Sequence, residues 1–250
     1  VIGAQMKMDL WQKAVPELAA RLGTASVEDF ANAIRTTDAF PKFSGATIET
    51  AGGTVTLAGM AKGAGMICPN MATMICVVLC DAAIDADAWR ALVKEAVDLS
   101  FNRVTVDGDT STNDTVYALA NGLSGVEVTE ADAPALLAAM TEVLGKLAYM
   151  LVQDGEGATK VIRIKVSGAK SEGDAERIAR SIGHSPLVKT AMFGHDANWA
   201  RLLCALGYSG AGVDPAKAVL KNGGVEVVRN ETPVNEVPGG RHDPMSGCPL

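Results

Sequence analysis

Three glycine-rich polar segments interrupt an otherwise apolar chain, and they hold most of the side chains that could do chemistry. They are residues 61–74, 107–114 and 154–160. The first contains Lys62 and the hydroxyl of Thr73, and the third places Glu156 between two glycines. Glycines allow a backbone to approach a ligand closely. These segments are therefore the candidate site, although an ordinary exposed turn would also explain the surroundings of Glu156.

The residue types of segment 61–74 leave its chemistry open. A phosphate loop would need the order Gly-x-x-x-x-Gly-Lys-Ser/Thr, which is absent. A glycine turn that leads into a buried strand explains the pattern equally well. A nucleophilic hydroxyl at Thr73 would need a base to take its proton. The adjacent pair His195 and Asp196 is weak evidence for such a base, and a surface histidine is the better interpretation.

Segment 107–114 begins like a calcium-binding loop but does not continue as one. Asp107, Asp109 and Ser111 occupy the first, third and fifth ligand positions. The sixth position is Thr112 instead of glycine, and the twelfth is Ala118 instead of glutamate. Carboxylates and hydroxyls at this density more often bond to backbone groups of turns. We therefore expect this segment to support a site and not to hold a metal.

Composition limits the classes of protein to which the chain can belong. The 250 residues are 48% hydrophobic, and the formal net charge of −7 with no basic run disfavours nucleic acid as a partner. Five cysteines without a Cys-x-x-Cys pair indicate reduced thiols. We see no continuous apolar run of the ~18 residues that a membrane span needs. We therefore expect a cytoplasmic protein with one large domain or two packed lobes.

Helical and strand patterns alternate along the chain, which predicts a mixed α/β or α+β fold. Apolar residues at helical spacing predict helices at 10–22, 26–34, 85–97 and 129–151. Alternating or continuous apolar runs predict a hairpin of 47–50 with 54–58, and strands at 74–80, 160–166 and 223–228. From residue 233 onward the chain is rich in proline and glycine, and no element is predicted.

Residues 62–74, which end in the order Met-Ala-Thr-Met, closely resemble the self-cleavage segment of the ornithine acetyltransferase family, the glutamate N-acetyltransferases of arginine biosynthesis. Further stretches match the family in the same order, and together the resemblance covers about residues 1–210. These stretches are 36–42, 107–114, 154–160, 189–194 and 198–199. Several long motifs in one order are far more specific than a lone Gly-x-Gly.

The resemblance implies an enzyme that cleaves itself between Ala72 and Thr73. The terminal amine of Thr73 would then activate its own hydroxyl, because such amines have a pKa of about 7.7–8.0. Thr73 would carry acetyl from N-acetylornithine to glutamate. Family positions that contact substrate map onto Thr36, Lys62, Thr73 and Glu156, with Lys62 suited to a carboxylate and Glu156 to an ammonium group. No metal or cofactor is implied, apart from acetyl-CoA as a further acetyl donor.

The resemblance also implies a layered αββα-like fold in which Thr73 starts a central strand. We expect a catalytic core at 1–212, cleaved into two parts that stay associated, a divergent segment at 213–250, and a homo-oligomer. The Thr-Gly oxyanion pair of the family precedes the segment that matches residues 1–3, and its closing Asn and Ser or Thr have no counterpart in 213–250. Two alternatives stay open: a related amino-terminal-nucleophile peptidase or amidase, and an inactive truncated copy.

Overall fold

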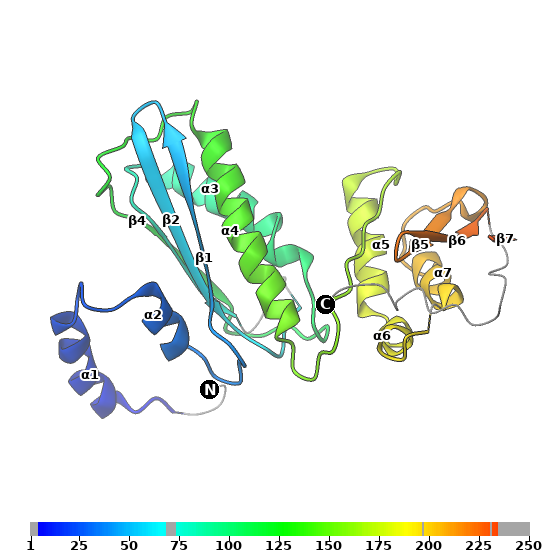
Figure 1. Cartoon of the computed structure of the whole chain (residues 1–250), viewed down its shortest axis with the longest axis horizontal. Helices are drawn as coiled ribbons and strands as arrows, with labels where there is room; N and C mark the ends of the chain where they lie inside the picture. The colour runs from blue at the N-terminus through cyan, green and yellow to red at the C-terminus, as the bar shows by residue number, and fades with distance from the viewer. Residues whose placement is uncertain (1–4, 69–73, 197, 231, 235–250) are drawn as a thin grey trace.

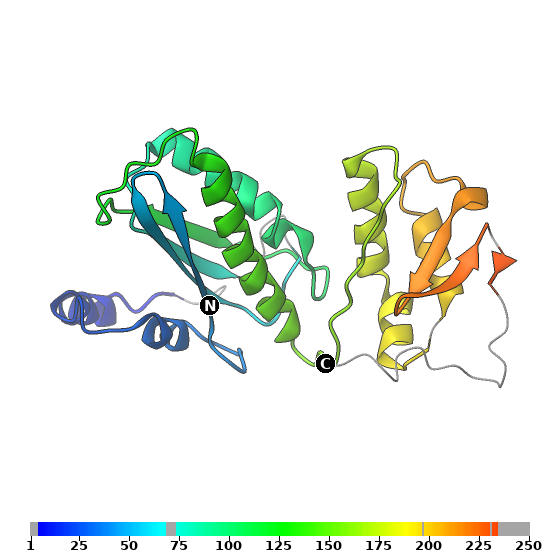
Figure 2. The same cartoon turned by 45° about the horizontal axis from the view of Figure 1, so that its top comes forward.

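The computed structural model describes residues 5–68, 74–196, 198–230 and 232–234. They form two units with separate hydrophobic clusters (Figures 1 and 2). The first unit holds a four-stranded sheet in the order β1-β2-β3-β4. Its strands are β1 (Lys42–Thr50), β2 (Gly53–Lys62), β3 (Ile75–Cys80) and β4 (Thr115–Ala120). β2 is antiparallel to β1 and β3, whereas β4 runs parallel to β3.

Alternating side chains explain why β2 and β3 form strands with one buried face. Val55 and Leu57 are buried while Thr54 and Thr56 are exposed, and Cys76 and Val78 are buried on β3. This period of two places every second residue on the same side of the sheet. The predicted hairpin and the predicted strand at 74–80 are therefore confirmed as β1–β2 and β3.

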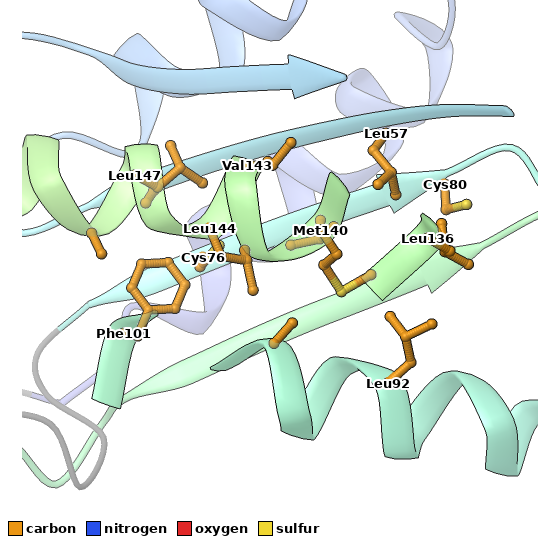
Figure 3. Packing of buried hydrophobic residues seen from close by; sticks show 14 of the residues in the cluster. Leu57, Cys76, Cys80, Leu92, Phe101, Leu136, Met140, Val143, Leu144 and Leu147 are labelled. Atoms are coloured by element: carbon orange, nitrogen blue, oxygen red, sulfur yellow. The ribbon is translucent and has the colours of Figure 1, made fainter. Parts of the chain in front are cut away.

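The long helix α4 (Ala133–Gln153) covers the buried face of the sheet together with α3 (Ala86–Asp98) (Figure 3). Leu136, Met140, Leu144 and Leu147 follow one another at helical spacing and are each at most 2% exposed. Among the described residues, α4 is the one helix long and apolar enough to cross a membrane by length and composition. Here its apolar stripe packs against the sheet and forms the core.

The opposite face of the sheet carries apolar side chains that are open to solvent. Register places Val77 beside Met60 and Tyr117, so the odd-numbered residues of β3 and β4 share this face. Its exposed members are Phe43, Ile75, Leu79, Tyr117 and Leu119. The described chain thus shows one helix layer and one sheet layer of the layered architecture that the sequence resemblance implies.

The second unit is smaller and also mixes helices with a sheet. Its helices are α5 (Glu172–His184), α6 (Pro186–Phe193) and α7 (Trp199–Gly207), and its strands are β5 (Val219–Asn222), β6 (Val225–Arg229) and β7 (Thr232–Pro233). The strands form an antiparallel sheet in the order β5-β6-β7. Ile178, Ile182, Val188 and Leu202 lie in the buried cluster of this unit. The mixed α+β class predicted from the sequence is confirmed.

The remaining elements are short or peripheral. α1 (Met8–Ala20) has no buried residue, and α2 (Val27–Ala33) contacts β1 and β2. A capping box joins Ser26 and Asp29 at the start of α2, which confirms the helix predicted at 26–34. Two 3-10 turns, η1 (Phe101–Arg103) and η2 (Pro215–Lys217), are the remaining elements of the residues that the structure describes.

The strand predicted at 160–166 is wrong. These residues have no strand pairing in the part of the chain that the structure describes. Ile164 and Val166 are half-buried against the second cluster, while Arg163 and Lys165 are exposed. The alternation therefore arises because one side of an extended segment is buried. A β-strand also needs a neighbouring strand to bond with, and burial does not provide one. The helix predicted from 129 begins at Ala133, because Thr129 forms a turn with Asp132.

Candidate functional site

A buried lysine occupies the base of the candidate site. Lys42, the first residue of β1, is 0% exposed. Its Nζ lies 2.7 Å from Asp38 Oδ1 and 2.5 Å from Asp154 Oδ2. Asp154 directly follows α4, and its carboxylate also accepts the Ala39 amide at 3.0 Å and 3.2 Å. One ammonium group thus joins the loop before β1 to the end of the core helix.

Asp38 extends this network to two further segments. Its Oδ2 accepts the Thr36 amide at 3.0 Å, and its Oδ1 accepts the Gly63 amide at 2.6 Å. Burial raises the pKa of Asp38, but the Gly63 amide, Lys42 and the Thr36 amide outweigh burial and bring the pKa to about 2. The carboxylate is therefore charged over the whole neutral range. It holds Thr36 and the residue after Lys62 in one place.

Glu156 meets the same glycine segment from the third loop. Its amide donates to the Ala64 carbonyl oxygen at 2.7 Å, and its Oε1 accepts the Thr37 hydroxyl at 2.9 Å. A Cβ on Gly65 would lie 3.0–3.2 Å from the Glu156 carboxylate, so any other residue here would require this carboxylate to shift. The Glu156 side chain is exposed and therefore accessible to a substrate.

Carboxylates of segment 107–114 accept backbone amides on both sides of residues 69–73. Asp107 accepts the amides of Met66 at 2.6 Å and Ile67 at 3.0 Å, together with that of Asp109 at 3.1 Å. Met66 has a φ of 55°, which a non-glycine residue rarely adopts, so Asp107 fixes an unfavourable backbone. These backbone bonds give the Asp107 carboxylate a structural role at this turn.

Asp114 lies on the other flank. Its Oδ1 accepts the Met74 amide at 3.0 Å, while its buried Oδ2 has no hydrogen-bond partner among the described residues. Burial raises the pKa of Asp114 to about 6, although the Met74 amide and the charge of Lys62 both lower it. A carboxyl group in this condition changes protonation close to neutral pH.

Ala72 and Thr73, the predicted cleavage site and nucleophile, lie outside the described residues. The structure does bring Thr36, Lys62 and Glu156 to one region through the contacts of Asp38, Gly63 and Ala64. The Thr37 hydroxyl, which sequence reasoning did not select, makes the direct contact with Glu156. Sequence reasoning also missed the buried network, whose signal was an Asp and a Lys four residues apart in stretch 36–42.

The histidines lie apart from this network where the structure describes them. His195 is exposed, as predicted for a surface histidine. His184, at the end of α5, has its Nε2 3.4 Å from the Cys68 sulfur. Desolvation, with smaller contributions from Arg180 and Lys189, lowers the pKa of His184, so its ring is neutral at neutral pH.

The described chain has a mixed α+β fold, and its buried charged network meets a glycine segment that precedes a central strand. These features define a class of mixed α+β proteins with a polar site at the end of the sheet. Comparison with protein families is specific: residues 1–244 match the model described as the ArgJ family. The chain belongs to the ArgJ family, and the resemblance in its sequence motifs is confirmed.

Individual relatives agree with this assignment. The chain is 61% identical over 235 residues to the arginine biosynthesis bifunctional protein ArgJ of Nitratidesulfovibrio vulgaris, and 49% identical over 237 residues to that of Symbiobacterium thermophilum. Each alignment covers 94% of this chain but only 60% and 59% of the relative. The crystal structure of the ArgJ protein from Bacillus halodurans matches with a TM-score of 0.59 and 38% identity, over 63% of this chain and 75% of that one.

Proposed function

We propose that the chain carries the acetyl-transfer site of a glutamate N-acetyltransferase that acts in arginine biosynthesis. The observation that supports this most directly is the convergence of the Glu156 carboxylate on the glycine segment that leads from Lys62 to Thr73. The named ArgJ relatives point to the same pathway. Because the chain spans about 60% of the length of these relatives, the activity of the whole protein is part of the proposal.

The first step is cleavage of the chain before Thr73. The Thr73 hydroxyl attacks the Ala72 carbonyl carbon and loses its proton, while the Thr73 nitrogen leaves that carbon and gains a proton. This exposes the Thr73 amine, and water then hydrolyses the resulting ester, which frees the Ala72 carboxyl group and restores the Thr73 hydroxyl. The new amine has a pKa near 7.7–8.0 and serves as the base for the neighbouring hydroxyl.

The second step is a two-stage exchange through an acetyl ester on Thr73. N-acetylornithine gives its acetyl group to the Thr73 oxygen, and ornithine leaves with the proton. Glutamate then attacks the ester through its amine, which yields N-acetylglutamate and restores the hydroxyl. We include acetyl-CoA as a further donor in the first stage, which gives an amino-acid N-acetyltransferase activity. No metal and no other cofactor takes part.

Substrate recognition follows from the charges that converge on the site. Both substrates are amino acids, so each presents a carboxylate and each presents or forms an ammonium group. Lys62 is suited to the carboxylate, Glu156 to the ammonium, and the Thr36 hydroxyl to a neutral polar atom. Asp38 fixes Thr36 and Gly63 through backbone bonds, which supports a preorganised site.

We further propose that the two cleavage parts stay associated, that the protein forms a homo-oligomer, and that it works in the cytoplasm. Cleavage would fall between β2 and β3, which pair along the register from Leu57–Cys80 to Lys62–Ile75. Separation of the parts would therefore break the centre of the sheet.

Intact-mass measurement of the full chain tests the first step. We expect two fragments whose masses correspond to cleavage between Ala72 and Thr73, and a single uncleaved mass for Thr73→Ala. Thr54→Ala, which removes an exposed hydroxyl in β2, is the matched control and should cleave normally. An uncleaved wild-type chain would contradict self-cleavage.

Isotope exchange tests the second step and separates the alternatives. Cleaved protein with labelled N-acetylornithine should transfer label to glutamate. Release of labelled acetate without transfer would identify an amidase, which uses water as the acceptor. A cleaved protein that neither transfers nor releases acetyl would identify an inactive copy.

A further inference from the structure

The two units enclose a cleft of about 660 Å³ between them (Figures 1 and 2). The described residues that line it come from α4 and the stretch 99–106 in the first unit, and from α5 and α6 in the second. Segment 156–164, which joins the units, also lines the cleft. Small-molecule sites are usually clefts of about 300–1,000 Å³. The cleft is therefore of the size that holds a small-molecule ligand.

The shape of the cleft favours a long and narrow ligand. Its lining residues run from Gly145 to Val152 on α4 and from Glu176 to Gly183 on α5. At 1.5 Å per residue, each stretch follows its helix for about 10 Å. Glu156 lines the same cleft, so the cleft reaches the carboxylate that we assign to the substrate ammonium group.

Apolar side chains of three elements are open to a ligand in the cleft. Tyr149 of α4, Ile162 of the joining segment and Phe193 of α6 are 44%, 39% and 66% exposed. Covering apolar surface removes it from water and favours binding. A ligand that fits the cleft therefore has an uncharged stretch that lies along these side chains.

Positive charge is concentrated in the cleft, although the whole chain is acidic. The described lining residues include five cationic side chains and two carboxylates, whereas the formal net charge of the chain is −7. Two of the cations are paired with carboxylates, Arg103 with Glu172 at 2.9 Å and Arg180 with Glu176 at 2.8 Å. The other cations of the lining are Lys160, Arg163 and Lys189. A cleft lined mainly by one sign of charge attracts ligands of the opposite sign.

Neutral groups hold the two lysines in the cleft. The Lys189 ammonium donates to the Val106 carbonyl oxygen at 2.7 Å. The Lys160 ammonium lies 3.4 Å from the Phe193 carbonyl oxygen and 5.9 Å from the centre of the Phe193 ring. A carbonyl oxygen does not cancel the charge, and an ammonium group has three donors. Together with exposed Arg163, these lysines can therefore bind phosphate groups through charge-assisted hydrogen bonds.

We propose that this cleft binds the coenzyme A part of an acetyl thioester donor. The phosphate groups meet Lys160, Arg163 and Lys189, and the uncharged pantetheine arm covers the exposed apolar side chains. Because Glu156 lines the same cleft, the acyl end of the arm reaches the proposed transfer site. Glutamate and N-acetylornithine have neither such an arm nor a phosphate group. This inference rests on the proposed use of acetyl-CoA as a donor.

Calorimetric titration of the full chain with free coenzyme A tests binding without any catalytic turnover. We expect one site with a Kd between about 1 μM and 1 mM, the usual range for enzyme substrates. The Kd should rise when salt is increased from about 50 mM to about 300 mM, because salt screens exposed charges. Pantetheine lacks the phosphates and adenosine bisphosphate lacks the arm, so each should bind at least about tenfold more weakly.

Arg163→Glu is the principal variant, because this side chain is exposed and can change without disturbing the core. Loss of a charge-assisted hydrogen bond to phosphate should raise the Kd for coenzyme A by about 10–100-fold. Lys165→Glu is the matched control, because it makes the same charge change in the same segment at an exposed residue outside the described lining. At about 150 mM salt, its Kd should stay within about twofold of the wild-type value.

The outcomes separate this inference from the proposed function. Coenzyme A binding that Arg163→Glu weakens selectively supports the cleft, even if the protein does not exchange acetyl between N-acetylornithine and glutamate. A protein that binds no coenzyme A at about 1 mM refutes the cleft, even if it does exchange acetyl.

Two other results would refute the cleft. Equal Kd values for Arg163→Glu and Lys165→Glu would mean that the lining residue has no special role. Inorganic phosphate that binds as tightly as coenzyme A would mean that the cations attract any anion. If Arg163→Glu does not fold, equal wild-type Kd values for coenzyme A and pantetheine would refute the cleft instead.

Discussion

The ammonium group of Lys42 holds two buried carboxylates, and Lys42→Met removes this charge while keeping most of the side-chain volume. In the wild type Nζ lies 2.7 Å from Asp38 Oδ1 and 2.5 Å from Asp154 Oδ2, and all three side chains are at most 6% exposed. The variant leaves both carboxylates without their shared cation. We expect a large loss of stability at neutral pH.

The size of the loss follows from the charges that remain. Removing one partner of a buried ion pair typically costs about 3–5 kcal/mol, because the other partner stays buried and uncompensated. The pKa of Asp38 gives a consistent scale: it is lowered from 3.8 to about 2, which corresponds to about 2 kcal/mol of stability at neutral pH from all of its partners together. We therefore expect Lys42→Met to lower the free energy of unfolding by about 3 kcal/mol.

Urea unfolding at pH 7 and pH 3, followed by the fluorescence of buried Trp89, measures this loss. A lowered pKa gives stability that is present above about pH 4 and lost as the pH falls through about 2. In the variant Asp38 loses the charge that lowers its pKa, so it protonates more readily, and a neutral carboxyl group needs no cation. The difference between variant and wild type should therefore shrink at pH 3 to less than about half its value at pH 7.

Lys146→Met is the matched control, because Lys146 pairs with Glu142 at 2.7 Å on the exposed surface of α4. An exposed pair of this kind contributes about 0.2–1 kcal/mol. A Lys42→Met cost below about 1 kcal/mol at pH 7, or the same cost at both pH values, would refute the reasoning from burial.

Two further predictions follow from crowding and from burial of charge. In Gly59→Ala the new Cβ would lie 2.8 Å from Val143 and 2.9 Å from Leu147. We therefore expect urea unfolding to give a free energy of unfolding that is lower by about 1–3 kcal/mol. An unchanged free energy of unfolding would mean that α4 moves freely to make room. The pKa of Asp114 is raised to about 6, so the folded protein pays for keeping this group charged at pH 7.5. Asp114→Asn removes that charge and should stabilise the protein by about 1 kcal/mol, a value reduced for solvent screening. This gain should vanish near pH 4, where Asp114 is already protonated, and a gain independent of pH would contradict it.

Local pattern was sufficient to predict much of the fold. The alternation of Val55 and Leu57 with threonines predicted β2, and the apolar spacing through Leu136 and Leu147 predicted α4. The extended segment 160–166 shows the limit of this approach. Its alternation is real, but a strand requires a hydrogen-bonding neighbour that one segment cannot specify.

The candidate site was predictable only in part, because its contacts join distant parts of the chain. The motifs selected Lys62 and Glu156, whereas the Thr37–Glu156 bond spans 119 residues and cannot be read from local spacing. Lysine is almost never fully buried, so its residue type gave no indication that Lys42 would be 0% exposed. The contact of Asp114 with the Met74 amide likewise depends on the parallel pairing of β3 with β4.

The position of β3 in the sheet has a consequence for how the protein would melt. β1 and β2 precede residue 73 and β3 and β4 follow it, so cleavage there would divide the sheet between two polypeptides that share six residue pairs. Unfolding would then change from a reaction of one molecule to a dissociation of two. Its midpoint temperature would rise with protein concentration, and dilution alone would favour the unfolded fragments.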